Sequence, residues 1–213
     1  MREWIDITQP LNENIAHWPE DEPFHYETSV TKEVSGSVNI GKITTSTHTG
    51  THIDAPFHFM NDGKRILDLD INRFIGRCIV LDIGEVDAVD REALVKAGIA
   101  ETKRLLIKTA LPNNPEHFPK EVPGITQDGA ACMKEYGVQL VGVDVPSVDP
   151  ITSKTLDGHH ALYENDIYIL ENVMLDHVET GLYEMVALPL ALEESDGSPT
   201  RAVIRKMGGS LDG

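Results

Sequence analysis

Cysteine is scarce in this chain of 213 residues, which contains only Cys78 and Cys132. Both lie in apolar segments, and no Cys-x-x-Cys spacing occurs. A disulfide framework or a thiolate zinc site needs clustered cysteines, so the pattern favours two reduced core thiols over a disulfide or a nucleophile. The Gly-x-Ser-x-Gly elbow of α/β-hydrolases is absent too, which leaves a serine nucleophile without support.

Basic residues and long apolar runs are also few. The 18 Lys and Arg residues face 35 Asp and Glu, which gives a formal charge of −17. A surface of this charge repels nucleic-acid phosphates and anionic lipids. No window approaches the ~20 apolar residues of a membrane span, and the first residues lack the apolar region of a secretion signal. We therefore expect a cytoplasmic protein without nucleic-acid or membrane partners.

Histidine, in contrast, is concentrated in one place. Three of the 9 His residues stand within the eleven residues 48–58, His-Thr-Gly-Thr-His-Ile-Asp-Ala-Pro-Phe-His. Imidazole and carboxylate are the groups that hold zinc or manganese while leaving a coordination position free for water. Apart from Ile53, their neighbours are mostly Gly, Thr and Pro instead of core-forming Leu or Ile. The segment therefore predicts a metal site.

The same segment predicts an extended backbone. The Thr and Gly residues after His48 disfavour a helix, and Pro56 cannot donate a helical N–H. On a strand, alternate side chains point to one side, which places His48, His52 and Asp54 together. Because four residues of straight strand span about 13 Å, the strand must bend for the two imidazoles to share an ion, and Gly50 permits that bend.

Apolar runs and turn signals predict strands that alternate with helices. A β-hairpin is expected over residues 26–34 and 38–47. Further strands are expected at residues 4–7, 77–83, 104–109, 140–145 and 167–173. Helices are expected at residues 91–96, 126–136 and 156–163. The long early hairpin argues against a purely doubly wound sheet. We predict an α/β fold, with a mixed sheet or flattened β-barrel and peripheral helices, in a single domain over residues 1–207. A disordered tail is predicted at residues 208–213.

Further candidates for the site stand elsewhere in the chain. Glu171 follows an apolar strand, where a buried carboxylate needs a metal, a backbone group or an arginine as partner. His159 and His160 are adjacent at a helix start, where the plain alternative is a pair of surface residues, and at most one of two neighbours faces a given site. Trp18 lies in a loop, where it either covers the core or contacts a ligand. The residues alone leave these alternatives open.

The His segment resembles the signature of the cyclase family of metal-dependent hydrolases, which includes bacterial kynurenine formamidase and isatin hydrolase. The likeness to the kynurenine formamidases covers nearly the whole chain. It is carried by Glu3-Trp4-Ile5-Asp6-Ile7, Trp18-Pro19, the stretch Gly-Val-Asp-Val-Pro-Ser-Val-Asp-Pro at 142–150, His159-His160, Ile-Leu-Glu-Asn-Val at 169–173 and Ala-Leu-Pro-Leu at 187–190.

The resemblance implies two divalent metal ions in each subunit, with zinc as the first choice and manganese as the alternative. His48, His52 and Asp54 would bind the first ion. Asp54 and Glu171 would bridge to the second ion, which His159 would complete. This family pattern selects His159 over His160, because the ligand His lies twelve residues before the ligand Glu.

The same resemblance implies a swivelling β/β/α fold, a homodimer and an arylformamidase that hydrolyses N-formyl-L-kynurenine to L-kynurenine and formate in tryptophan degradation. His58 would be the catalytic proton donor and acceptor, or would bind the second metal directly. Trp18, together with Phe24, would stack on the aromatic substrate. This chain has Glu20 where many relatives have glycine.

Two other functions compete with this one. The first is the same chemistry on another small cyclic amide, such as an isatin-like lactam. The second is a non-catalytic zinc-binding module with a structural metal. Structural zinc sites are usually closed by four protein ligands rich in Cys, whereas this segment is rich in His and carboxylate. The sequence therefore favours catalysis.

Overall fold

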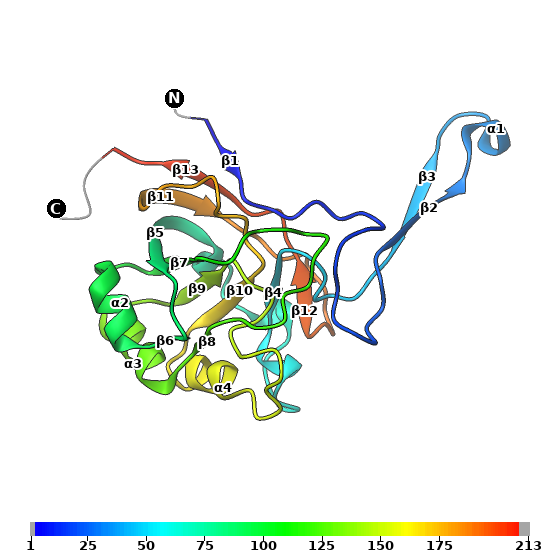
Figure 1. The fold of residues 1–213 in the computed structure, drawn as a ribbon. Coiled ribbons are helices and arrows are strands. Elements are labelled where there is room, and N and C mark those ends of the chain that lie inside the picture. The colour runs from blue at the N-terminus through cyan, green and yellow to red at the C-terminus, as the bar shows by residue number, and fades with distance from the viewer. Residues whose placement is uncertain (1–2, 209–213) are drawn as a thin grey trace.

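A nine-stranded mixed sheet forms the centre of the fold in the computed structural model, which describes residues 3–208 (Figure 1). From edge to edge its strands are β1 (Ile5–Asp6), β13 (Val203–Lys206), β11 (Gly181–Val186), β5 (Ile75–Gly84), β7 (Arg104–Thr109), β9 (Leu140–Val143), β10 (Tyr168–Glu171), β4 (His52–Asp54) and β12 (Gly197–Pro199). The strands from β5 to β10 are parallel, and the pairs on either side are antiparallel. The predicted mixed α/β fold with peripheral helices is confirmed.

Successive residues of β7 point to opposite faces of the sheet, as the two-residue period of a strand requires. Leu105 and Ile107 join an apolar cluster that includes Leu94 of helix α2 (Arg91–Ala97). Leu106 joins a second cluster that includes Phe74. All five side chains are completely buried. The sheet therefore has a core on each face, which explains why its central strands are continuous apolar runs.

Three helices gather beside the sheet: α2, α3 (Gln127–Glu135) and α4 (Asp157–Glu164) (Figure 1). The first two begin at side-chain caps. The carboxylate of Asp90 accepts from the N–H of Ala93 at 2.8 Å, and the hydroxyl of Thr126 accepts from the N–H of Gly129 at 3.0 Å. Each cap satisfies one of the four N–H groups that a helix start leaves without an intrahelical partner.

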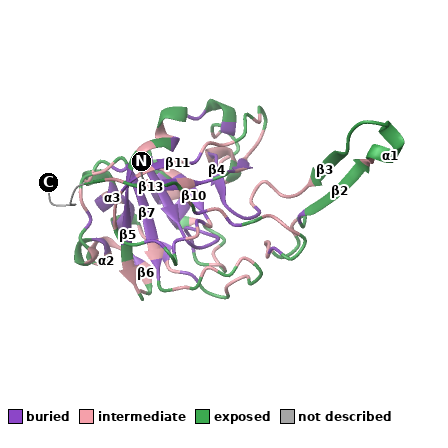
Figure 2. Ribbon diagram, turned by 90° about the horizontal axis from the view of Figure 1, so that it is seen from above, coloured by how far each residue is buried: buried purple, intermediate pink, exposed green. Residues whose placement is uncertain are grey.

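The predicted hairpin forms an arm that projects from the body (Figures 1 and 2). Its strands β2 (His25–Val30) and β3 (Ile40–Thr44) are antiparallel and shorter than expected. The tip is one helical turn, α1 (Lys32–Ser35), which ends at Gly36 with φ of 76°. The prediction left only residues 35–37 between the two strands, whereas residues 31–39 connect them in the structure, because residues 32–35 form a helical turn.

The remaining elements are short. Strands β6 (Ala88–Val89) and β8 (Gly124–Ile125) pair with each other, and the 3₁₀ turns are η1 (Pro56–His58), η2 (Ile66–Asp68) and η3 (Ile71–Phe74). None of the helices within residues 3–208 has the length and apolar character needed to cross a membrane. The predicted tail lies outside the described residues except for Gly208.

Candidate metal centre

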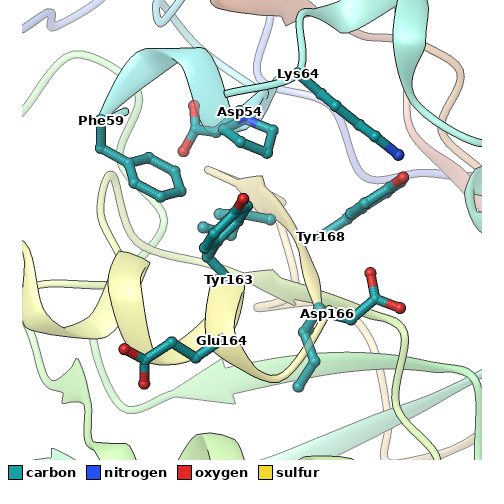
Figure 3. Close-up of a pocket in the computed structure, with 10 residues that line it drawn as sticks. Asp54, Phe59, Lys64, Tyr163, Glu164, Asp166 and Tyr168 are labelled. Atoms are coloured by element: carbon teal, nitrogen blue, oxygen red, sulfur yellow. The ribbon is translucent and has the colours of Figure 1, made fainter. Parts of the chain in front are cut away.

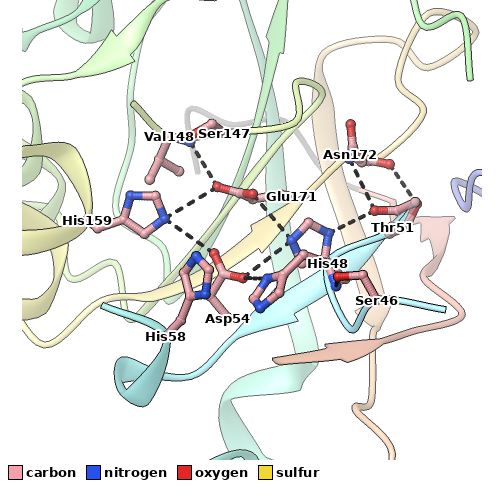
Figure 4. Close-up of polar contacts among 12 residues, drawn as sticks. Ser46, His48, Thr51, Asp54, His58, Ser147, Val148, His159, Glu171 and Asn172 are labelled. Carbon is pink, nitrogen blue, oxygen red and sulfur yellow. Dashed lines mark hydrogen bonds and ion pairs between the residues drawn. The ribbon is translucent and has the colours of Figure 1, made fainter. Parts of the chain in front are cut away.

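Antiparallel pairing of β4 with β10 brings together residues that are about 120 positions apart. The register places Glu171 opposite His52, and Ile169 opposite Asp54. His52 and Asp54 share one face of β4, whereas Ile53 between them points into the core and is completely buried. The predicted convergence of the His segment with Glu171 is therefore present in the fold (Figure 4).

The bend before β4 occurs at Gly50, as predicted, where φ is +68°. This left-handed conformation favours glycine, and a Cβ atom at the position would lie 2.7 Å from Cδ2 of Leu11, which would have to move. The expectation of one strand from His48 to Asp54 is wrong, since the strand begins at His52 and His48 lies in a turn. The pairing of β4 with both β10 and β12 ends at His52.

The carboxylate of Asp54 has the imidazoles of His48 and His52 at one oxygen and that of His159 at the other. Its Oδ1 is 2.9 Å from Nδ1 of His48 and 3.3 Å from Nε2 of His52. Its Oδ2 is 3.5 Å from Nε2 of His159. Asp54 is buried, and Oδ2 has no hydrogen-bond partner. A buried carboxylate oxygen without a donor is costly, and a bound cation would remove that cost.

Glu171 completes the cluster on the other side of Asp54. Its Oε2 is 3.4 Å from Nε2 of His52, and its Oε1 is 3.9 Å from Nε2 of His159. The N–H of Val148 donates to Oε1 at 2.9 Å and fixes the carboxylate. Three sets of three possible metal ligands result. Asp54 belongs to two of them, which are His48, His52 and Asp54, and Asp54, His159 and Glu171, while the third is His48, His58 and Asp196. The mixture of imidazole and carboxylate suits a divalent metal ion.

The outer nitrogens of two imidazoles are held by the protein. Nδ1 of His52 donates to the carbonyl of Gly50 at 2.8 Å, so its Nε2 is free to face the cluster. Nδ1 of His159 donates to Oδ2 of Asp149 at 2.6 Å. Asp149 also accepts from the N–H groups of His159 and Gly158, at 3.0 and 2.8 Å. Such outer contacts fix the ring orientation of metal-binding histidines and leave one nitrogen available.

His48 has the corresponding partner in Asp196, whose Oδ2 lies 3.0 Å from its Nε2. The ring also packs so closely on Gly197 that a Cβ atom there would lie 2.7 Å from Cε1. Neither Asp149 nor Asp196 was predicted from the sequence. Asp149 lies within residues 142–150, whose likeness to the kynurenine formamidases could have signalled it. Asp196 is 142 residues from Asp54, and nothing local distinguishes it from the other acids.

Hydrogen bonds within the cluster change its proton affinities. Burial by itself would lower the pKa of His52, but contacts with Asp54 and Glu171 outweigh burial and raise that pKa to about 10. Burial also opposes the charge on His159 and His48, but contacts with Asp149 and Asp54 raise the pKa of His159 to about 10, and contacts with Asp196 and Asp54 raise that of His48 to about 9. Burial raises the pKa of Asp54, but the imidazoles more than offset it and lower that pKa well below its usual range. Without a metal, protons therefore supply the positive charge that the carboxylates require, and a metal would displace them.

Replacing Asp149 with asparagine should weaken metal binding about 10- to 100-fold. Whichever way the amide lies, its NH₂ meets a donor, either the N–H of Gly158 or the two N–H groups of His159. Competition with a chromogenic chelator would measure the affinity. The control is Asp157→Asn, at an exposed residue in the first turn of α4, the helix that carries His159. Unchanged affinity in Asp149→Asn would contradict this orienting role.

The structure separates the two adjacent histidines. His159 is 3% exposed and faces the cluster, whereas the ring of His160 packs edge-on against Phe59 at 5.5 Å. His58 lies at the end of η1, with its ring 4.0 Å from that of His48. Its Nδ1 is 3.7 Å from Oδ2 of Asp196. The cluster therefore contains His159, with His58 beside it at the rim.

A cavity of about 280 Å³ opens onto the cluster, and Trp18 lines it together with His48, His52, His58 and His159. The ring that contacts Trp18 is Phe118, edge-on at 4.9 Å. The expectation for Phe24 is wrong, because that side chain is only 8% exposed and does not line the cavity. Phe118 lies in a loop, and nothing in the neighbouring sequence indicated that it would contact Trp18.

A second cavity, of about 380 Å³, is lined in part by Asp54 (Figure 3). Its labelled walls are Phe59, Tyr163 and Tyr168, with Lys64 at its edge. It contains none of the cluster's imidazoles. The smaller cavity is therefore the candidate substrate site, because reacting groups must lie within reach of the cluster.

Sequence comparison agrees with this geometry. The model of the Cyclase family matches residues 5–150. The chain belongs to the Cyclase family. A protein of Bacillus cytotoxicus named kynurenine formamidase is 54% identical over 205 residues, which cover 96% of this chain and 98% of that one. A kynurenine formamidase of Bacillus cereus is 54% identical over 203 residues and covers 95% and 97% of the two chains.

Solved structures of the Cyclase type share the fold. A predicted metal-dependent hydrolase from Bacillus stearothermophilus superposes with a TM-score of 0.80 at 26% identity and covers 96% of this chain and 98% of its own. Isatin hydrolase A from Labrenzia aggregata gives a TM-score of 0.77 at 22% identity over 96% and 93% of the chains. This last likeness concerns the fold alone.

Proposed function

We propose that this Cyclase-family protein is an arylformamidase that hydrolyses N-formyl-L-kynurenine to L-kynurenine and formate. The observation that carries the proposal is the buried cluster in which Asp54 is shared by two sets of metal ligands beside an open cavity. The relatives named kynurenine formamidase, at 54% identity over nearly the full length, support this substrate.

The proposed centre holds two divalent ions, with zinc as the first choice and manganese as the alternative. His48, His52 and Asp54 would hold one, and Asp54, His159 and Glu171 the other. Zinc lowers the pKa of bound water to about 7 and stabilises negative charge that develops on a carbonyl oxygen. Two divalent ions against two carboxylates leave about two net positive charges for this purpose. The protein keeps the cluster buried, which strengthens these electrostatic effects.

His58 is proposed as the group that moves protons. It lines the cavity, its side chain is 33% exposed, and it belongs to neither of the two ligand sets that share Asp54, although it forms a third set with His48 and Asp196. An imidazole can accept and donate a proton near neutral pH. In the hydrolysis of a formamide the departing aryl nitrogen needs a proton, and His58 would donate it. Trp18 would offer its ring to the aromatic part of the substrate.

His58→Ala should lower kcat by about 10²- to 10⁴-fold, the usual contribution of a general acid–base group, and should keep most of the bound metal. Steady-state kinetics and metal analysis of the same preparation would measure both. His17→Ala, at a histidine outside the cluster, is the matched control. Near-normal turnover in the His58 variant would remove it from proton transfer, and loss of metal would make it a ligand.

Product analysis distinguishes the proposed function from its alternatives. Purified protein with quantified metal should release formate from N-formyl-L-kynurenine and should open the ring of isatin far more slowly. Faster isatin opening would favour a lactam substrate. A protein that contains metal, hydrolyses neither compound and does not bind a small metal-binding anion would be a structural zinc module.

The arm supports a proposed homodimer. Its apolar side chains are exposed to solvent: Tyr26 at 52%, Val34 at 81%, Ile40 at 49% and Ile43 at 60%. An isolated two-stranded hairpin is marginally stable, and exposed apolar patches mark interaction surfaces. Sedimentation equilibrium should give the mass of two chains of 23.5 kDa. Ile43→Ser should shift the protein towards the monomer, and a wild-type monomer would overturn the proposal.

A further inference from the structure

The candidate substrate cavity carries two formal charges outside the His and Glu cluster: Asp21 and Lys154. The other residues that line the cavity outside the cluster are neutral: Trp18, Ser147, Pro150, Ile151, Ser153 and Leu156. One negative and one positive side chain, in a part of the cavity that is otherwise neutral, favour a ligand that carries both signs of charge.

Both charged side chains are available to a ligand. Asp21 uses Oδ1 to accept from the N–H of Glu22 at 2.8 Å and is half-buried. Lys154 is exposed. Within residues 3–208 no ion pair within 4.0 Å engages either of them, with each other or with another residue. Their charges are therefore not neutralised by the protein itself.

Two turns with unusual backbone conformations hold these side chains at the cavity. The N–H of Asp21 donates to the carbonyl of Trp18 at 3.1 Å, and Glu20 between them has φ of 72°. On the other turn Lys154 precedes Leu156, which has φ of 52°. Non-glycine residues rarely adopt this left-handed conformation, and where they do they cluster at ligand sites.

The second turn is fixed by its own hydrogen bonds. The N–H of Ser153 donates to the carbonyl of Pro150 at 2.8 Å, and the N–H of Leu156 donates to the hydroxyl of Ser153 at 3.1 Å. Lys154 lies between these bonded residues. Its backbone is therefore positioned before a ligand arrives, which reduces the ordering needed on binding.

We propose that Asp21 and Lys154 form a subsite for the α-amino acid group of the substrate. Asp21 faces the ammonium group and Lys154 faces the carboxylate. The inference rests on the proposed function, because N-formyl-L-kynurenine carries a zwitterionic amino acid at the opposite end from its formamide. With the formamide at the cluster and the ring beside Trp18, the charged end of the substrate meets the charged part of the cavity.

Three substrates test each charge separately. They are N-formyl-L-kynurenine, its analogue without the α-carboxylate, and an aryl formamide without the whole amino acid. Lys154→Met should lower kcat/KM for the first about tenfold, as expected for one lost charge-assisted contact, and should not affect the other two. Asp21→Asn should lower kcat/KM for the first two and leave the third unchanged.

Matched variants separate the subsite from general charge effects. Glu20→Gln removes the neighbouring acid on the same turn, and Lys64→Met removes a lysine at the other cavity (Figure 3). Both should match wild type on all three substrates. Lys154→Arg and Asp21→Glu keep the charge and should recover most of kcat/KM. The proposal is overturned if Lys154→Met and Asp21→Asn lose the same fraction of activity on all three substrates, or lose no activity on any of them.

The wild-type protein provides an independent measurement if a variant fails to fold. Raising the ionic strength should raise KM for N-formyl-L-kynurenine and leave KM for the uncharged formamide unchanged, because salt screens charges at a partly exposed site. Equal KM values for the two substrates at every ionic strength would overturn the subsite while leaving the formamidase function intact. If wild type hydrolyses none of the three formamides, the proposed function itself fails.

Discussion

His52→Ala should remove metal and activity together. The side chain is almost completely buried, and its Nε2 lies 3.3 Å from Asp54 and 3.4 Å from Glu171. It therefore contacts both carboxylates that the two proposed ligand sets use. A bound metal stabilises the charge of the transition state by several kcal/mol. Because each 1.4 kcal/mol changes a rate about tenfold, we expect the activity of the variant to fall below about one thousandth of wild type. Metal analysis and formate release would measure the two effects.

His160→Ala is the matched control for this variant. The residue is also a histidine near the cluster, but its ring packs on Phe59 and belongs to neither ligand set. It should keep both metal and activity. A His52 variant that retained stoichiometric metal and normal turnover would show that the buried imidazole is not a ligand.

Thorough removal of metal with a chelator should abolish hydrolysis, and zinc or manganese should restore it. The carboxylates of Asp54 and Glu171 are buried, and the protonated imidazoles that balance them in the metal-free state cannot supply the same chemistry. Activity should fall by at least about 10³-fold, because no nucleophilic Ser elbow is present as an alternative. Titration of the stripped protein with metal would give the number of ions per chain.

Two outcomes of the stripping experiment would contradict the proposal. Full activity in protein shown to be free of metal would rule out a metal-dependent reaction. Recovery of full activity with one ion per chain would rule out the need for a second ion. Circular dichroism of the stripped protein would show that its fold is kept, so that loss of activity is not loss of structure.

Much of the fold followed from features that act within a few residues. The three helices, the apolar strands and the early hairpin were predicted, because side-chain alternation and capping depend on near neighbours. The bend at Gly50 followed from the same kind of argument. The point where the strand begins, at His52 instead of His48, was not predicted, since the pairing of β4 ends where its partners β10 and β12 end.

By itself the sequence determined the chemistry of the site: three imidazoles and a carboxylate close together, with an acid after a later strand. Only the tertiary structure decided that Asp149 and Asp196 hold the outer nitrogens of two rings and that Phe118 packs on Trp18. These contacts join segments from different strands and loops. Spacing along a chain fixes local conformation, but the register between distant strands and loops fixes which side chains meet.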